Sequence, residues 1–167
     1  MRRATYLLVV VTLALGLAAP SAVAQPTTFR TTLSGAEEVP IRDTPAHGVA
    51  VFKLSADGTE LRYRIVVTNI ENVFAAHIHC NVAGMNGPIG VTLFEGPVGG
   101  GPVNGVLVAD TVTGTDPGNA CGWATFEDLL EAVESGGAYV NVHTNDGDAT
   151  PDTGPGDFPG GEIRGQL

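Results

Sequence analysis

Glycine and proline recur so often along this chain that they divide it into short segments. The sequence holds 23 Gly and 11 Pro among 167 residues. Several of the segments between them alternate apolar and polar residues, as in 61–67, where Arg62 and Arg64 interrupt an apolar series. Such short alternating runs are typical of half-buried strands. The pattern predicts an all-β fold, an immunoglobulin-like or Greek-key β-sandwich or barrel of about seven to eight strands with one short helix.

The expected strands are the segments bounded by these turn-forming residues. An Asp57-Gly58 pair predicts a hairpin turn between the second and the third of them. In chain order, strands are expected at 29–33, 49–54, 61–67, around His77, at 91–94, 106–112, around His143 and at 162–167.

One segment, residues 125–135, departs from the strand pattern and predicts a helix. Thr125 suits the N-cap position, Asp128 three residues later completes a capping box, and Gly136-Gly137 ends the segment. Apolar residues recur at helical spacing, so we expect this stripe to cover one end of the β-structure. The stripe consists of Phe126, Leu129, Leu130 and Val133.

The first 24 residues have the pattern of a secretory signal peptide. Two arginines, Arg2 and Arg3, precede an apolar run at 7–17, and Ala22-Val23-Ala24 offers small residues before a cleavage site. A retained signal anchor is the alternative, but the run is shorter than the ~20 residues that span a bilayer. We therefore expect cleavage after Ala24 and a secreted or periplasmic domain over residues 25–167, free of the membrane.

The charge of the chain limits its partners. The sequence carries 18 acidic and 8 basic residues, a net charge of −10. Cleavage would remove two of the basic residues and none of the acidic ones, leaving −12. Nucleic acids and anionic membranes are repelled by such a surface. The partners that fit are an extracellular protein or small ligand, or a cation.

Two cysteines, Cys80 and Cys121, are expected to form a disulfide, because an exported chain folds where oxidation is allowed. Thiolate ligation of a metal is the alternative, since Cys80 follows His79 directly. Strand alternation places Cys80 on the face of Ile78 and opposite His79. That placement favours the disulfide.

Three of the four histidines, His77, His79 and His143, lie in two strand-like segments. His77 and His79 are two residues apart and share a face opposite Ile78, and His143 faces away from Val142. If the apolar residues form the core, all three imidazoles lie on the outer, water-facing side of a sheet. Imidazole is the commonest protein ligand for transition metals, so the trio is a candidate site for copper or zinc, of which copper binds more tightly.

An alternative interpretation is structural: the histidines hold loops in place through hydrogen bonds. Of the remaining imidazoles only His47 is left as a fourth ligand, and the sequence does not decide its role. The closing strand bears on both interpretations, because Glu162 and Arg164 share a face. Glu162 is a candidate to accept a ring N–H of a metal-bound histidine. The alternative, favoured for Arg164, is a cross-strand ion pair worth at most about 1 kcal/mol if exposed.

Other motifs carry no chemistry. The acidic segment 145–152 lacks the Glu that closes a calcium-binding EF-hand loop, so calcium is not expected. The Gly-rich segment 84–90 lacks the Lys and Ser/Thr of a phosphate-binding loop. No serine has a recognisable catalytic spacing, and no catalytic residue is predicted.

Four motifs follow one another along the chain: Ala76–His79, Gly84–Pro88, Tyr139–Thr144 and Gly160–Leu167. Together they make the chain resemble the CHRD domain, named after chordin. The resemblance covers the chain from about residue 29 to its end and implies an immunoglobulin-like β-barrel with a limited likeness to copper/zinc superoxide dismutase. Two features depart from the family pattern: Cys80-Asn81 follows the His-x-His strand, and a long acidic segment follows His143.

Two functional hypotheses follow. The favoured one is a secreted CHRD-type β-sandwich module that binds a partner or a metal and catalyses nothing, with His77, His79 and His143 as the candidate site for copper or zinc. The other is a copper-dependent redox enzyme that resembles superoxide dismutase. The sequence lacks the further histidines and aspartate of a second, zinc-binding site.

Overall fold

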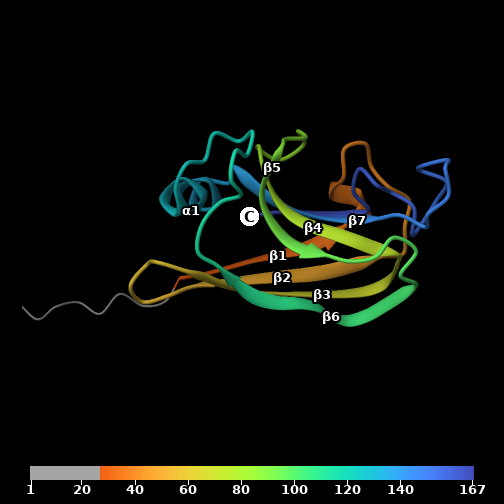
Figure 1. Cartoon of the computed structure of the whole chain (residues 1–167), viewed down its shortest axis with the longest axis horizontal. Helices are drawn as coiled ribbons and strands as arrows, with labels where there is room; N and C mark the ends of the chain where they lie inside the picture. The colour runs from red at the N-terminus through yellow and green to blue at the C-terminus, as the bar shows by residue number, and fades with distance from the viewer. Residues whose placement is uncertain (1–26) are drawn as a thin grey trace, which may run out of the picture.

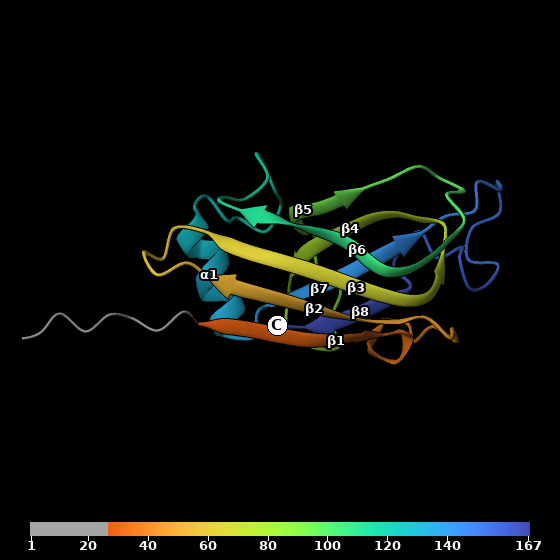
Figure 2. The ribbon, with the colours of Figure 1, turned by 90° about the horizontal axis from the view of Figure 1, so that it is seen from below.

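Eight antiparallel strands form one sheet that curls into a nearly closed barrel (Figures 1 and 2). The computed structural model describes residues 27–167, so the expected leader lies outside the described residues. The strands follow the order β5-β4-β7-β8-β1-β2-β3-β6 across the sheet, which confirms the all-β prediction. Their bounds are β1 Thr28–Ser34, β2 His47–Leu54, β3 Leu61–Glu71, β4 Val73–Cys80, β5 Ile89–Glu95, β6 Pro102–Val112, β7 Ala138–Thr144 and β8 Ile163–Gln166.

The barrel interior holds the apolar residues that the alternation pattern selects. On β3 the side chains of Tyr63 and Ile65 are buried, whereas Arg62 and Arg64 are exposed. Val140 of β7 and Ile78 of β4 are fully buried in the same core. Each buried Val or Ile side chain contributes about 1.5–3 kcal/mol by leaving water, so this core fixes the register of the strands.

The single α-helix, α1, spans Phe126–Glu134 and covers one end of the barrel (Figure 1). Thr125 and Asp128 form the predicted capping box, in which the Thr125 side chain accepts from the Asp128 N–H. Leu129 and Val133 pack against the core. The predicted helix and its position are confirmed.

A disulfide joins Cys80, the last residue of β4, to Cys121, which precedes α1. The two residues are 41 apart in sequence and their Cα atoms lie 5.7 Å apart. The predicted pairing is therefore confirmed. It ties the end of a histidine-bearing strand to the segment that leads into α1.

Among the described residues, no helix has the length and the apolar character needed to cross a membrane.

Candidate metal centre

The three histidines lie on two neighbouring strands. β4 and β7 pair in antiparallel register, with His77 opposite Asn141 and His143 opposite Ala75. His79 lies one alternate position further along β4, on the same face as His77. The alternation pattern therefore correctly predicted that His77 and His79 share a face. The pairing of β4 with β7 brings His143 beside His79, although the two residues are 64 apart in sequence.

The three rings form a compact group. One nitrogen from each ring lies within 4.8 Å of the others. The ring centroids of His77 and His143 are 4.9 Å apart, those of His79 and His143 5.4 Å, and those of His77 and His79 5.5 Å. The shortest contact joins the Nε2 atoms of His79 and His143 at 3.3 Å.

The prediction that these rings face water is wrong. They lie opposite the barrel core, as expected, but His79 is 7% exposed and His143 6%, and only His77 is partly exposed. The reason is that two loops fold over this wall of the sheet and bond to the rings. Gly87, between β4 and β5, contacts His79, and Pro159, just before β8, contacts His143.

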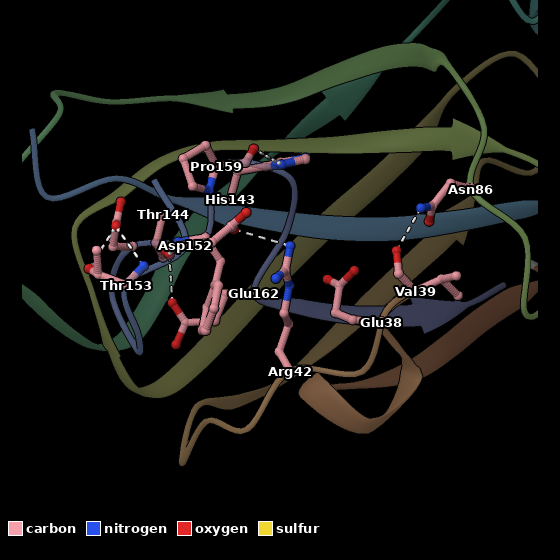
Figure 3. A network of polar contacts seen from close by, with 12 residues as sticks. Glu38, Val39, Arg42, Asn86, His143, Thr144, Asp152, Thr153, Pro159 and Glu162 are labelled. Atoms are coloured by element: carbon pink, nitrogen blue, oxygen red, sulfur yellow. Dashed lines mark hydrogen bonds and ion pairs between the residues drawn. The ribbon is translucent and has the colours of Figure 1, made fainter. Parts of the chain in front are cut away.

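Both of these loop contacts use the Nδ1 atom of the ring. His79 Nδ1 lies 2.9 Å from the Gly87 carbonyl oxygen, and His143 Nδ1 lies 3.0 Å from that of Pro159 (Figure 3). A carbonyl oxygen only accepts, so each Nδ1 carries the proton and each Nε2 keeps its lone pair. The structural interpretation thus holds for the Nδ1 atoms of His79 and His143, and it leaves the Nε2 atoms of these two rings free to bind an ion.

The ring pKa values favour the neutral form that a metal requires. Burial, aided by the neighbouring histidines His77 and His79, lowers the pKa of His143 to about 3. Burial likewise lowers the pKa of His79 to about 4, against the Gly87 hydrogen bond that raises it. Burial also lowers the pKa of His77, although the carboxylate of Asp116 opposes this shift. These shifts favour ion binding over protonation of the rings at neutral pH.

The spacing of two of the nitrogens, His79 Nε2 and His143 Nε2, matches a tetrahedral ion. Bonds of 2.0–2.1 Å from such an ion to two imidazole nitrogens place those nitrogens about 3.3–3.4 Å apart. The Nε2 atoms of His79 and His143 are 3.3 Å apart. In addition, His77 Nδ1 is buried and has no hydrogen-bond partner among the described residues. The donor set therefore fits an ion bound by three imidazoles.

Glycines in the two loops allow them to approach the histidines this closely. A Cβ atom on Gly87 would lie 1.5 Å from the carbonyl oxygen of Cys80. Gly161 has a φ of 124°, and a Cβ atom there would lie 2.4 Å from Nδ2 of Asn141. The glycines of both motifs are thus required sterically. In the sequence they signal that these two loops approach the sheet closely.

The structure does not bring Glu162 to the histidines. Strand β8 begins only at Ile163, so strand alternation does not extend to Glu162. Its carboxylate accepts instead from the Thr144 hydroxyl (Figure 3) and from the Thr44 hydroxyl and the Gly156 N–H. Pro159, rather than Glu162, therefore takes the ring N–H of His143.

Arg164 also lies differently from the expected exposed ion pair. Its side chain is buried because it stacks on the Tyr139 ring, with the guanidinium carbon 3.4 Å from the ring centroid. One nitrogen donates to Asn86 Oδ1 at 3.3 Å, and Asn86 in turn donates to the Val39 carbonyl. Tyr139 stacks on His79 at 5.0 Å, so Arg164 supports the site from behind this ring.

Two buried polar residues beside the site, Glu38 and Asn141, were not predicted from the sequence as site residues. Glu38 follows the short 3-10 helix Gly35–Glu37, and its Oε2 accepts from Asn141 Nδ2 at 3.4 Å. Burial raises the pKa of Glu38 to about 7, although the charge of Arg164 opposes this shift. Figure 3 shows its carboxylate turned toward the blue strands. Nothing in the local sequence distinguishes Glu38 from its exposed neighbour Glu37.

His47 and the acidic segment take no part in the centre. His47 is exposed at the start of β2, and its Nδ1 contacts the Pro45 carbonyl oxygen at 3.1 Å. The acidic segment after β7 bonds within itself through Asn145 and Gly147, and its Asp152 pairs with Arg42 at 3.2 Å (Figure 3).

The fold and the site together define a class: a small all-β domain with a buried three-histidine group on the outer wall of its barrel. The family model described as CHRD domain matches residues 29–150. The chain therefore belongs to the CHRD domain family. No curated protein and no solved structure matches it.

Proposed function

We propose that this protein is a secreted CHRD-type binding module that holds one copper or zinc ion through His77, His79 and His143. The observation that carries the proposal is the 3.3 Å approach of two nitrogens, His79 Nε2 and His143 Nε2, whose Nδ1 atoms both donate to carbonyls. Two lone pairs that face each other repel unless a cation lies between them. An ion at this position removes the repulsion, and His77, whose Nδ1 is buried without a partner among the described residues, is the candidate third ligand.

Direct measurement of metal content tests the proposal. The purified protein, reconstituted separately with copper and zinc and dialysed, is analysed by mass spectrometry for both metals. We expect one ion per chain in the wild type, no bound ion in His143→Ala, and none in the double variant His77→Ala/His79→Ala. His47→Ala is the matched control, because it removes an exposed imidazole outside the group, and it should bind as the wild type does.

Two results would contradict the proposal: no stoichiometric ion in the wild type, or equal binding in His143→Ala. Competition between the two metals then identifies the ion. Copper is expected to win at equal concentration, following the general order of affinities for nitrogen ligands. A dismutase assay of the copper-loaded protein tests the alternative, a copper-dependent redox enzyme. Activity in the wild type that is lost in His143→Ala would support this alternative.

Export is part of this proposal and is tested separately. The disulfide between Cys80 and Cys121 supports it, because such bonds persist in oxidising compartments. The intact mass of the protein recovered outside the cytoplasm should correspond to a chain that begins at Gln25. A chain that retains residues 1–24 would contradict cleavage after Ala24.

A further inference from the structure

The register of β4 and β7 places a fourth side chain around the three imidazoles. His77 is opposite Asn141, and the next alternate pair along the sheet is Ala75 opposite His143. His79 lies at the alternate position beyond His77, so His79 and His143 occupy opposite corners of the group. Their Nε2 atoms meet between these corners. His77 and Asn141 are directly opposite each other on the same face, and their pair lies between His79 and His143 in the register.

Asn141 carries a hydrogen-bond acceptor that nothing in the described residues satisfies. Its side chain is 2% exposed, and its Oδ1 atom is buried without a partner. Its Nδ2 donates to Glu38 Oε2, which fixes the amide orientation and leaves Oδ1 as the free atom. A buried carbonyl without a partner costs about 1–3 kcal/mol. Its persistence beside three metal-type ligands indicates a donor that binds with the ion.

Three imidazoles leave a tetrahedral ion with one open position. In the strand register, Asn141 is the residue opposite His77, and this pair lies between His79 and His143. We propose that the open position faces Asn141, whose Oδ1 accepts a hydrogen bond from a small protic ligand held there. The Asn141 side chain is 2% exposed, so this ligand is a small one, of which water is the simplest case. The inference rests on the proposed metal binding and adds the chemistry of the fourth ligand.

Cobalt(II) reconstitution tests the role of Asn141, because the visible spectrum of cobalt reports a change in its ligands. Wild type, Asn141→Leu and Asn141→Asp are loaded with cobalt and titrated with azide, which has no proton to donate to Oδ1. In the wild type, azide must displace the hydrogen-bonded ligand. In Asn141→Leu that hydrogen bond is gone, so azide should bind about tenfold more tightly, the effect of one buried hydrogen bond.

Asn141→Asp gives a gain-of-function readout at the same position. A carboxylate is itself a ligand for such ions, so the variant should bind cobalt about tenfold or more tightly and no longer respond to azide. Asn104→Asp on β6 is the matched control, since it adds the same charge away from β4 and β7. It should leave cobalt and azide affinities unchanged.

Each outcome is decisive. Unchanged azide affinity in a folded Asn141→Leu, or a spectrum of Asn141→Asp identical to that of the wild type, would overturn the assignment of the open position. If Asn141→Leu does not fold, as checked by thermal unfolding, the nearly isosteric Asn141→Asp decides alone. Failure of the wild type to bind cobalt at all would instead refute the three-histidine site, before any azide is added.

Discussion

Replacing Glu38 by Gln should stabilise the protein, and the gain should depend on pH. The Glu38 side chain is 4% exposed, and its Oε1 atom has no partner among the described residues. Burial raises its pKa from 4.5 to about 7, against the charges of Arg164 and Arg42 and the hydrogen bond from Asn141. Glutamine keeps the shape of the protonated acid and can still accept the Asn141 N–H, but it never ionises.

The magnitude follows from the pKa shift. Because the folded pKa is raised, the folded state binds more protons than the unfolded state between pH 4.5 and about 7. The free energy of unfolding of the wild type therefore falls as pH rises through this window. A rise in the pKa of Glu38 from 4.5 to about 7, at 1.36 kcal/mol for each pH unit, lowers the free energy of unfolding by about 3 kcal/mol. Glu38→Gln avoids this loss.

Urea unfolding of wild type and Glu38→Gln at about pH 4 and about pH 8 measures the effect. Near pH 4 the two proteins should differ little. At pH 8 the difference in free energy of unfolding between variant and wild type should exceed the difference at pH 4 by about 3 kcal/mol, in favour of the variant. The neutral histidines cancel from the comparison, since both proteins contain them. Glu37→Gln, an exposed neighbour, is the matched control and should show no pH-dependent gain.

A stability difference that stays constant between these pH values would refute the argument. It would mean that Glu38 ionises in the folded protein as readily as in the unfolded chain.

Three further predictions follow from the same structure. Replacing Cys80 and Cys121 by alanine should lower the free energy of unfolding by roughly 3–4 kcal/mol, because their bond closes a 41-residue loop; a loss under about 1 kcal/mol in urea unfolding would count against this. Gly161→Ala should cost about 2 kcal/mol or more, since its Cβ would meet Asn141 and its φ is positive, whereas Gly160→Ala has 3.5 Å of room and should be nearly neutral by the same assay. Zinc affinity, measured by competition with a chelator, should stay nearly constant as pH falls from about 8 to about 6, because burial holds the pKa values of the histidine rings below their usual 6.5; a steep decline beginning near pH 7 would contradict this.

The alternation of apolar and polar residues along the strands predicted those features of the structure that depend on local sequence. It placed His77, His79 and His143 on the face opposite the core, because side chains alternate between the two faces of a strand and the apolar residues on the other face are buried. It also predicted the capping box of α1 and the side of β4 on which Cys80 lies. In these cases the determining contacts are within a few residues or follow from which face packs inward.

The environment of that face could not be predicted in the same way. Whether the histidines meet water depends on loops that return from distant parts of the chain, and backbone carbonyls such as those of Gly87 and Pro159 leave no mark of their own in a sequence. Alternation also fails one residue outside a strand, as Glu162 shows. The burial of Glu38 arises from the packing of its segment over β7, a contact across 103 residues.

The separation of the ligands along the chain sets an order of events for a nascent molecule. His79 and His143 are 64 residues apart and meet only after β4 and β7 have paired, and the carbonyl that orients His143 comes later still, at Pro159. A partly synthesised chain thus lacks the site altogether. Under the proposed function, acquisition of an ion has to follow folding, and the compartment in which folding finishes would determine which metals the protein encounters.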